Sequence, residues 1–325
     1  MSDKQYRILV SDRTIDPAGL DLLREVAELD FLEGYAAPEA FSARVTDVDA
    51  IFCRSGVIDA SVIDAAPRLK IVSRHGVGYD NVDIDACTRR GVVVTTTGAA
   101  NSQSVSEHAI AMMLYLGRFL YRTNAEMDDG QWERTTLVGT ELFEKTLGIV
   151  GLGRVGTRLA KHAAGFDMQI LAYDPYLDAD ACAASGARQV DLQTLLRESD
   201  YVSLHLPLNA ETRHLIGAEE LALMKKTAIL VNCARGGIVD EQALYDALVA
   251  RRLAAAGVDV FEDEPLPGGH PLVGLPNVCH SPHIAGQTAE SLVRVSLQTA
   301  ANILTVLRGE TLDPGYVVNP EVFSA

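Results

Sequence analysis

Short apolar runs alternate with helix-like segments along almost the whole chain, and this alternation limits the folds that are open to it. Strand-like runs rich in β-branched residues occupy residues 6–12, 49–56, 69–76 and 91–98. Between them, Asp16 followed by Pro17, and Asp59, are typical helix starts. Because a helix between two strands returns the chain in the same direction, this order predicts a parallel sheet covered by helices.

A second alternating series follows. Its strand-like runs occupy residues 146–151, 169–174, 200–208, 227–234, 253–261 and 277–283. Six strands separated by helices predict a doubly wound parallel sheet. Residues 287–308 then carry one amphipathic helical pattern that ends near Gly309. Since 325 residues exceed what one core usually supports, the two series predict an α/β protein of two domains with a boundary near residues 98–101.

Residues 102–127 lie between the two series and are predicted to form one long helix. Apolar residues occur on more than one of its faces, so this helix is expected to be buried on several sides. An interdomain helix and a subunit interface would both bury it in this way. The sequence leaves these two alternatives open.

Charge and cysteine content exclude several classes of partner. The chain has 28 Lys and Arg against 44 Asp and Glu, a formal net charge of −16, which disfavours nucleic acid and anionic membranes as partners. A small anionic substrate must then be attracted by local arginines. The five cysteines are scattered and form no CxxC pair, so we expect neither a disulfide framework nor a metal site. Without an apolar run of membrane-spanning length, we expect a cytoplasmic protein.

The stretch LGIVGLGRVG at residues 147–156 places three glycines between a strand-like run and a helix-like run. In this context Gly151 allows a tight turn, Gly153 lets the backbone approach a pyrophosphate, and Gly156 lets helix and strand pack closely. The N-terminus of the following helix offers N–H groups and partial positive charge to the phosphates. The stretch therefore predicts a dinucleotide-binding Rossmann domain.

Asp174 ends the next strand-like run, 174 − 156 = 18 residues after the last glycine. A carboxylate at this place accepts a hydrogen bond from the ribose 2′-hydroxyl and repels a 2′-phosphate, which favours NAD over NADP. The same residue precedes Pro175 and is also suited to capping a turn.

Three polar residues follow successive strand-like runs of the second series. His283 is the candidate proton donor and acceptor, Glu264 is placed to hold its imidazole, and Arg235 is suited to gripping a substrate carboxylate through two hydrogen bonds. Since parallel strands end at one edge of the sheet, these side chains are predicted to form a catalytic group.

With the glycine fingerprint, the stretches NCARGGIVDEQAL, GVDVFEDEP and SPHIAGQT occur in the order typical of one family. Over nearly its whole length, the chain resembles the D-isomer-specific 2-hydroxyacid dehydrogenases. The resemblance implies that Arg235 binds substrate, that Glu264 is the partner of the histidine, and that His283 is the general acid and base. Departures are few: Ala285 stands where glycine is common, Gly98 stands where proline is frequent, and Glu264 argues against formate as substrate.

The resemblance also implies a domain layout and further contacts. A flavodoxin-like substrate domain is expected in two segments, residues 1–100 and 287–325, with the NAD-binding domain at residues 101–286. Homodimers are common in the family. Besides the three glycines and Asp174, the implied cofactor contacts are Arg154, Val155, Pro207, Thr212, Cys233, Ala234 and Asp259.

Arginines near the ends of two early strands bear on the substrate. Arg54 ends one early strand, and Arg74 ends the next one, directly before the loop that contains Val77 and Gly78. Together with Asn101, the two arginines resemble the substrate residues of the phosphoglycerate dehydrogenase branch. Ordinary strand-end charges are the alternative interpretation of both arginines. The sequence favours 3-phosphoglycerate and phosphohydroxypyruvate, while glyoxylate or hydroxypyruvate reduction and other 2-hydroxy acids stay open.

Two further expectations concern regulation. The chain leaves no room after its last helix for an appended regulatory domain, so feedback through such a domain is not expected. The fold also resembles NADH-sensing corepressors, which act by binding partner proteins. An enzyme is the favoured interpretation, and turnover distinguishes the two.

Overall fold

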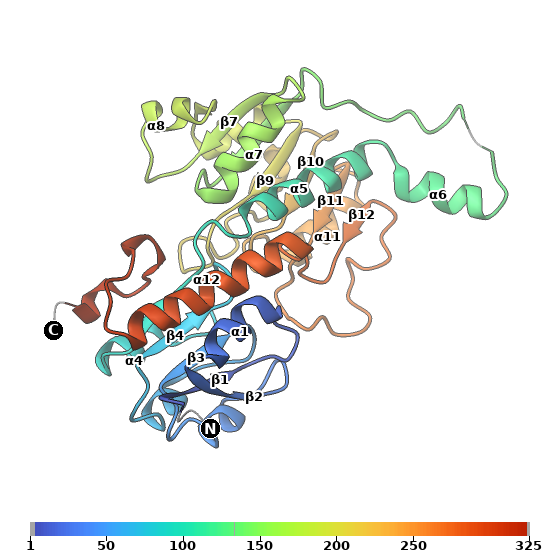
Figure 1. Ribbon diagram of the computed structural model, residues 1–325. Helices are drawn as coiled ribbons and strands as arrows, with labels where there is room; N and C mark the ends of the chain where they lie inside the picture. The colour runs from blue at the N-terminus through green and yellow to red at the C-terminus, as the bar shows by residue number, and fades with distance from the viewer. Residues whose placement is uncertain (1–3, 133, 324–325) are drawn as a thin grey trace. The chain divides into compact units, whose positions relative to one another are not determined.

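The computed structural model describes residues 4–132 and 134–323. The chain divides into two compact units: a first unit of Met1–Asn101 with Gln287–Ala325, and a second unit of Ser102–Gly286. Figure 1 shows the elements of both. Each unit contains one sheet of entirely parallel strands with helices on its faces, which confirms the predicted fold class.

The sheet of the first unit has five strands in the order β2-β1-β3-β4-β5, the flavodoxin-like order. Its elements are β1 (Tyr6–Val10), α1 (Pro17–Arg24), β2 (Ala27–Phe31), α2 (Pro38–Ser42), β3 (Ala50–Cys53), α3 (Ala60–Asp64), β4 (Ile71–Arg74), α4 (Ile84–Arg89), β5 (Val93–Thr95) and α12 (Ala289–Leu307), followed by the short 3-10 helices η1 (Pro314–Tyr316) and η2 (Pro320–Phe323). The order reverses between β1 and β3, so the ends of these strands flank a switch point where such sheets bind ligands.

Both faces of this sheet are buried, which explains its nearly continuous apolar strands. Leu9, Ile51 and Val72 pack on one face against a cluster that includes Val62 of α3. Alternate residues such as Phe52 pack on the other face against residues of α12. Figure 1 shows α12 beside α1, and the two helices are in contact. The C-terminal helix therefore completes the core begun by the first hundred residues.

Buried side-chain hydrogen bonds fix the returning segment to the first sheet. Asn302 of α12 donates through Nδ2 to the carbonyl oxygen of Thr96 (3.0 Å). Asn319 accepts from the N–H of Val94 (2.8 Å) and donates to the carbonyl oxygen of Val92 (3.0 Å). Because these amides are buried, their loss would leave unpaired main-chain groups as well as lost bonds.

The sheet of the second unit has seven strands in the order β12-β11-β10-β9-β6-β7-β8. Its elements are α5 (Ser102–Gly117), α6 (Leu120–Asp128), β6 (Thr146–Val150), α7 (Arg154–Ala164), β7 (Gln169–Tyr173), α8 (Ala179–Ala184), β8 (Arg188–Gln189), α9 (Leu192–Glu198), β9 (Tyr201–Leu204), α10 (Ala218–Leu223), β10 (Ile229–Asn232), α11 (Glu241–Val249), β11 (Ala255–Val258) and β12 (Val278–His280). The first six strands of the unit follow the doubly wound order, with β6 and β9 at the switch point.

Three details differ from the prediction. Strands β2 and β8 were not predicted, and both lie at sheet edges. The single helix predicted for residues 102–127 was wrong, because Phe119 adopts a left-handed conformation (φ 53°) that separates α5 from α6. Many residues of α5 are buried, as expected, whereas none of α6 is. In Figure 1, α6 lies away from the second sheet.

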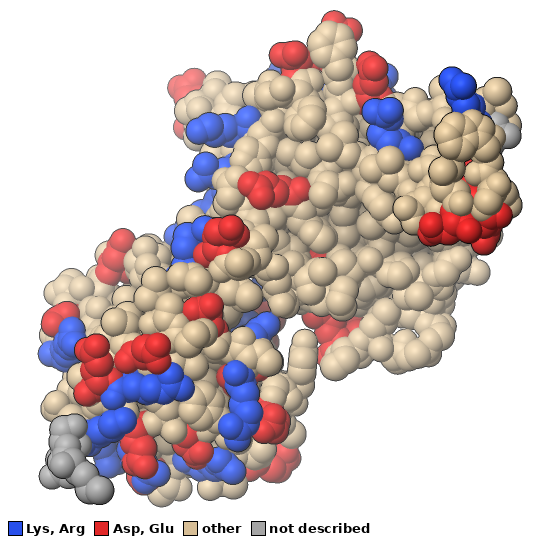
Figure 2. Space-filling model, turned by 45° about the vertical axis from the view of Figure 1, so that its right-hand side comes forward, with Lys and Arg blue, Asp and Glu red and all other residues tan. Residues whose placement is uncertain are grey.

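Charged side chains of both signs occur on the surface of the first unit. On the face of the first unit drawn in Figure 2, basic side chains lie among acidic ones. Exposed ion pairs of this unit include Arg13–Glu33, Arg24–Asp21 and Arg44–Asp30. Over residues 4–132 and 134–323, no three His, Cys, Asp or Glu side chains are grouped to hold a metal ion. No helix in those ranges has the length and apolar character needed to span a bilayer.

The stability of the second unit is expected to depend on pH through His205. Desolvation lowers the pKa of this histidine to about 4, below its usual 6.5, and its Nε2 lies 2.9 Å from Ser203 Oγ. Between pH 6.5 and about 4 the unfolded chain therefore binds a proton that the folded chain does not. Lowering the pH from 7 to 5 should cost on the order of 1–2 kcal/mol of unfolding free energy through this group. In denaturant titrations, His205→Asn should lose less stability than the wild type over this interval; equal losses would contradict the assignment.

Candidate active site

The glycine turn lies between β6 and α7 at the switch point of the second sheet. Gly151 has φ 92°, and a Cβ there would lie 2.7 Å from the carbonyl oxygen of His205. A Cβ on Gly156 would lie 2.2 Å from the carbonyl oxygen of Gly151. At Gly153, by contrast, no described atom lies within 4 Å of such a Cβ. Two glycines therefore shape the turn, while the third leaves its outer side open to a ligand.

This turn fits a pyrophosphate. Helix α7 begins at Arg154, followed by Val155, and its N-cap residue Gly153 supplies no side-chain hydrogen bond to the first turn. An anion at this end would interact with main-chain N–H groups and with the positive end of the helix dipole. Cofactor contacts were predicted at Arg154 and Val155, and both lie in this first turn.

Asp174 lies beside the glycine turn, directly after β7. Its Oδ2 accepts a hydrogen bond from the N–H of Leu152 (2.9 Å), and its Oδ1 accepts one from the N–H of Tyr176 (3.0 Å). The carboxylate thus caps two turns, which is the structural role that the sequence offered as an alternative. Each carboxylate oxygen has a further lone pair, so these bonds leave room for a ribose hydroxyl.

The remaining predicted cofactor residues follow strands of the same sheet. Pro207 and Thr212 follow β9, Cys233 and Ala234 follow β10, and Asp259 follows β11. Thr212 donates to the carbonyl oxygen of Pro207 (2.6 Å), which closes that loop. Burial raises the pKa of the Cys233 thiol well above its usual value, so this group stays protonated.

Asp259 is fully buried and organises the turn that carries His283. Its Oδ1 accepts from Ser281 Oγ (2.6 Å) and from the N–H of Ile284 (2.9 Å), and its Oδ2 accepts from the N–H of Ala285 (2.9 Å). Its carbonyl oxygen accepts from the N–H of His283 (2.7 Å). With φ 52°, His283 has a backbone conformation that is uncommon for a residue with a side chain, and these bonds hold it there.

His283 and Glu264 form a direct pair. His283 Nδ1 lies 2.6 Å from Glu264 Oε2, and Glu264 Oε1 accepts from the N–H of Phe261 (3.0 Å). Partial burial opposes ionisation of Glu264, but the hydrogen bond to His283 and the charges of His283 and Arg235 outweigh it and leave the pKa of the carboxyl below its usual value. The carboxylate is therefore ionised at neutral pH and fixes the orientation of the imidazole.

Arg235 lies in the loop after β10. Its carbonyl oxygen accepts from Asn232 Nδ2 (2.9 Å), and its Nη1 donates to the carbonyl oxygen of Ala234 (2.6 Å). The charge of Arg235 contributes to lowering the pKa of Glu264, after the larger contribution of His283. The structure joins Glu264 directly to His283, and Arg235 follows β10, the neighbour of β11 in the sheet.

His108 and Ser281 are functional candidates that sequence reasoning missed. His108 lies on α5, and its Nε2 is 3.1 Å from Ser281 Oγ, which in turn donates to Asp259. The sequence does show His108 as a polar residue on a largely apolar helix. The sequence pattern does not indicate which strand or loop the imidazole of His108 would contact. Through this chain of contacts α5 supports the turn of His283.

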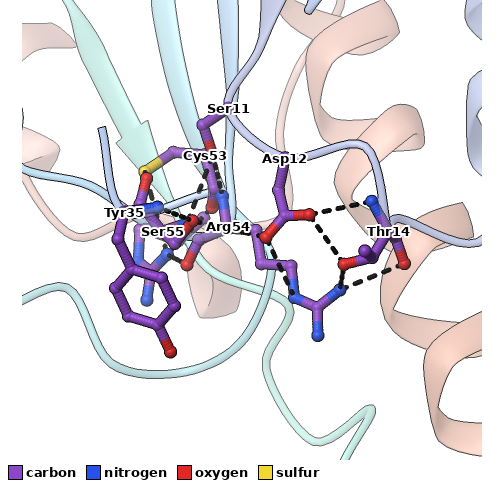
Figure 3. Close-up of polar contacts among 8 residues, drawn as sticks. Ser11, Asp12, Thr14, Tyr35, Cys53, Arg54 and Ser55 are labelled. Carbon is purple, nitrogen blue, oxygen red and sulfur yellow. Dashed lines mark hydrogen bonds and ion pairs between the residues drawn. The ribbon is translucent and has the colours of Figure 1, made fainter. Parts of the chain in front are cut away.

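The substrate candidates of the first unit follow β3 and β4. Figure 3 shows Arg54 against the loop after β1. Its Nη1 donates to the carbonyl oxygen of Thr14 (3.0 Å) and also contacts Thr14 Oγ1, while its Nε lies 4.0 Å from Asp12 Oδ2. Hydrogen bonds from Thr14 and the charge of Arg54 outweigh the effect of burial and lower the pKa of Asp12. Sequence reasoning missed Asp12, which lies at the switch point of this sheet.

The other substrate candidates of the first unit are Arg74, Val77, Gly78 and Asn101, and in the described part of the chain only Arg74 has hydrogen-bond partners for the groups of interest. Arg74 donates to three main-chain carbonyl oxygens, those of Gly78 (2.6 Å), Cys53 (2.9 Å) and Arg54 (2.6 Å). Within the described ranges, nothing accepts a hydrogen bond from the N–H of Val77 or Gly78. Asn101 Oδ1 is buried and also has no partner among the described atoms.

Comparison with known proteins identifies the family. The model described as D-isomer specific 2-hydroxyacid dehydrogenase, NAD binding domain, matches residues 110–285. The chain is 41% identical to the D-3-phosphoglycerate dehydrogenase of Methanocaldococcus jannaschii over 94% of this chain and 58% of that protein. It is also 41% identical to the glyoxylate reductase of Korarchaeum cryptofilum, over 97% of this chain and 96% of that protein. The chain thus spans little more than half of the first two curated relatives, 58% and 54%.

Comparison with solved structures leads to the same family. The glyoxylate reductase from Paecilomyes thermophila matches with a TM-score of 0.86 and 32% identity, covering 98% of this chain and 99% of that one. The D-lactate dehydrogenase from Aquifex aeolicus, complexed with NAD and lactic acid, matches with a TM-score of 0.86 and 30% identity, covering 96% and 98%. The chain belongs to the D-isomer specific 2-hydroxyacid dehydrogenase family, and its second unit carries the NAD-binding domain of that family.

Proposed function

We propose that this protein is an NAD-dependent dehydrogenase that interconverts a small D-2-hydroxy acid and its 2-oxo acid. The observation that supports this most directly is the 2.6 Å contact between His283 Nδ1 and Glu264 Oε2 near the guanidinium of Arg235. An imidazole held by a carboxylate exchanges protons near neutral pH, and a neighbouring guanidinium binds a carboxylate. These are the groups that hydride transfer at C2 of a 2-oxo acid requires.

In the proposed mechanism the chain's own residues bind the acid and move one proton. Bound NADH supplies the hydride to C2. Arg235 binds the substrate carboxylate. The imidazolium of His283, stabilised by ionised Glu264, donates a proton to the C2 oxygen. In the reverse direction neutral His283 accepts this proton.

The cofactor is assigned to the turn and loops at the carboxyl ends of the second sheet. Open space at Gly153 and the uncapped first turn of α7 support pyrophosphate binding at Gly151, Gly153, Arg154, Val155 and Gly156. Asp174 is assigned to the ribose. Pro207, Thr212, Cys233, Ala234 and Asp259 are assigned to the rest of the cofactor.

For the substrate we propose 3-phosphoglycerate and phosphohydroxypyruvate, with contacts at Arg54, Arg74 and Asn101 as well as at the N–H groups of Val77 and Gly78. The position of Arg54 at a switch point and the relatives named D-3-phosphoglycerate dehydrogenase support this choice. Glyoxylate or hydroxypyruvate reduction is the second candidate. It is favoured by the engagement of Arg74 with main-chain carbonyl oxygens, which leaves fewer donors for a phosphate.

A panel of 2-oxo acids tests the proposal. NADH oxidation would be measured with phosphohydroxypyruvate, hydroxypyruvate, glyoxylate, 2-oxoglutarate and sulfopyruvate, and kcat/KM compared. The highest kcat/KM is expected with phosphohydroxypyruvate. A clear preference for glyoxylate or hydroxypyruvate would select the second candidate. No turnover with any acid would contradict the enzyme assignment and favour an NADH-sensing binding protein.

Replacing His283 separates catalysis from cofactor binding. His283→Ala should lower kcat by about 100-fold or more, because it removes the general acid and base, while the Kd for NADH stays nearly unchanged. His280→Ala is the matched control, since His280 is exposed and lies three residues earlier, on β12. Near-normal kcat in His283→Ala would refute the assignment.

Replacing Asp174 tests the ribose contact. Asp174→Ala should lower the ratio of kcat/KM with NADH to kcat/KM with NADPH by about 10-fold or more, since one charge-assisted hydrogen bond is lost and repulsion of the 2′-phosphate is relieved. Asp178→Ala is the control, because it removes the same charge and also a cap, that of α8. If both variants keep the wild-type ratio, Asp174 is a turn cap only.

We further propose that the protein is a cytoplasmic homodimer. All five cysteines are free and four are buried, as is usual in a reducing compartment. Large apolar side chains are exposed along residues 115–143, including Trp132 (76% exposed) and Val138 (78%). An exposed apolar segment of this kind is typical of an interface, and a second copy of the chain would bury it.

Sedimentation velocity tests the dimer. The wild type should sediment with the mass of two chains, and Trp132→Glu should shift it toward one chain because a charge would be buried in the interface. Tyr176→Glu, at a residue that is 82% exposed outside this segment, should leave the dimer intact. A dimer that is unaffected by Trp132→Glu would place the interface elsewhere.

A further inference from the structure

Arg74 is partly buried and donates through two of its three nitrogens to the chain's own main chain. It ends β4, opposite Cys53 of β3 in the strand register. Its Nε donates to the carbonyl oxygen of Gly78, and its Nη1 donates to those of Cys53 and Arg54. One guanidinium therefore joins the loop after β3 to the loop after β4.

The loop after β4 is the element that Arg74 holds. Two main-chain hydrogen bonds also anchor this loop. The N–H of Gly76 donates to the carbonyl oxygen of Arg74, and the N–H of Thr97 donates to the carbonyl oxygen of Gly76. In the described parts of the chain, the N–H groups of Val77, Gly78 and Tyr79 donate to no acceptor. Three successive N–H groups without an acceptor are available to hydrogen-bond an anion.

Arg74 also brings a positive charge to this loop through its bond to the carbonyl oxygen of Gly78. No Asp or Glu carboxylate in the described ranges lies within ion-pair distance of its guanidinium. Burial and the charges of Arg54 and Arg74 lower the pKa of His75 to about 3, so this neighbouring ring is neutral. The positive charge next to the unpaired N–H groups thus comes from the guanidinium that fixes them.

Arg54 makes different contacts from those of Arg74. Its Nη1 is used by Thr14 and its Nε faces Asp12 Oδ2 at 4.0 Å. Figure 3 shows the third nitrogen of Arg54 pointing away from both residues. Arg54 thus has one nitrogen bonded to Thr14 and one facing Asp12, whereas Nε and Nη1 of Arg74 donate to three main-chain carbonyl oxygens of two loops.

We propose that Arg74 is a positioning residue that holds the Val77–Gly78 loop in the conformation that binds the substrate carboxylate, and that it does not contact the substituent at C3. This rests on the proposed function and revises one of its contacts. Arg74 then acts equally on every 2-oxo acid, because every such acid carries the carboxylate. Arg54 acts only on acids that carry a substituent beyond C2.

Steady-state kinetics of a matched pair of variants test this division. Arg74→Met should raise KM by about 10-fold or more for glyoxylate, hydroxypyruvate and phosphohydroxypyruvate alike, as expected for the loss of charge-assisted hydrogen bonds, with kcat changed less than KM. Arg54→Met should raise KM for the two substituted acids and spare glyoxylate. A loss in Arg74→Met confined to phosphohydroxypyruvate would overturn the proposal, because it would show a direct phosphate contact.

Hydrogen exchange gives a readout that does not depend on turnover. The amides of Gly76 and Thr97, whose hydrogen bonds anchor the loop, should exchange faster in Arg74→Met than in the wild type and should be unchanged in Arg54→Met. Arg74→Lys, which retains a charged donor, should restore part of the protection and part of the KM. Unchanged exchange in Arg74→Met would overturn the proposal. If the wild type turns over none of the acids, the proposed function fails, while the exchange data still decide whether Arg74 holds the loop.

Thermal unfolding and the Kd for NADH serve as controls for the integrity of each unit. If Arg74→Met does not fold, Arg74→Lys carries the test, since its altered donor geometry should still raise KM for all three acids by the same factor. Unequal factors in that variant would contradict the proposal.

Discussion

Parallel strands leave all their carboxyl ends at one edge of a sheet, and the candidate chemistry of this protein depends on that constraint. In the second unit, β6 ends at the glycine turn, β7 at Asp174, β10 near Arg235 and β12 near His283. In the first unit, β1, β3 and β4 end at or next to Asp12, Arg54 and Arg74. Since each crossover helix begins near the same edge, its N–H groups add partial positive charge there. The direction of the strands alone therefore places residues that are far apart in the sequence at the same edge of each sheet.

Several charged side chains in these loops hold the backbone through hydrogen bonds to main-chain groups. Asp259 accepts from the N–H groups of Ile284 and Ala285, and Asp174 accepts from those of Leu152 and Tyr176. Arg74 performs the same function with opposite charge, through carbonyl oxygens. Loops that lack a regular ladder must satisfy their main-chain groups in this way, because an unpaired buried group is costly. The conformation of each loop therefore depends on a few ionised side chains.

The errors of sequence reasoning have physical causes that can be named. Strands β2 and β8 lie at sheet edges, where only part of a strand is buried, and AELDF and the two-residue β8 carry no continuous apolar run. The helical pattern of residues 102–127 continues across Phe119, but a single left-handed residue divides it, and nothing in its side chain signals that conformation. His108 was missed because its partner Ser281 lies 173 residues away. Each of these features is decided by packing at long range rather than by local preference.

The sequence by itself determined the fold class, the glycine turn and the order in which polar residues follow the strands. It could do so because the periodicity of apolar residues and the spacing of glycines are local properties. Only the tertiary structure decided which groups each polar side chain meets. Glu264 contacts His283, and Arg54 contacts Thr14 and Asp12. Arg74 donates to the carbonyl oxygens of two loops. Two arginines that look equivalent in the sequence thus differ in the folded protein, because strand register and loop conformation set the direction and partners of a guanidinium.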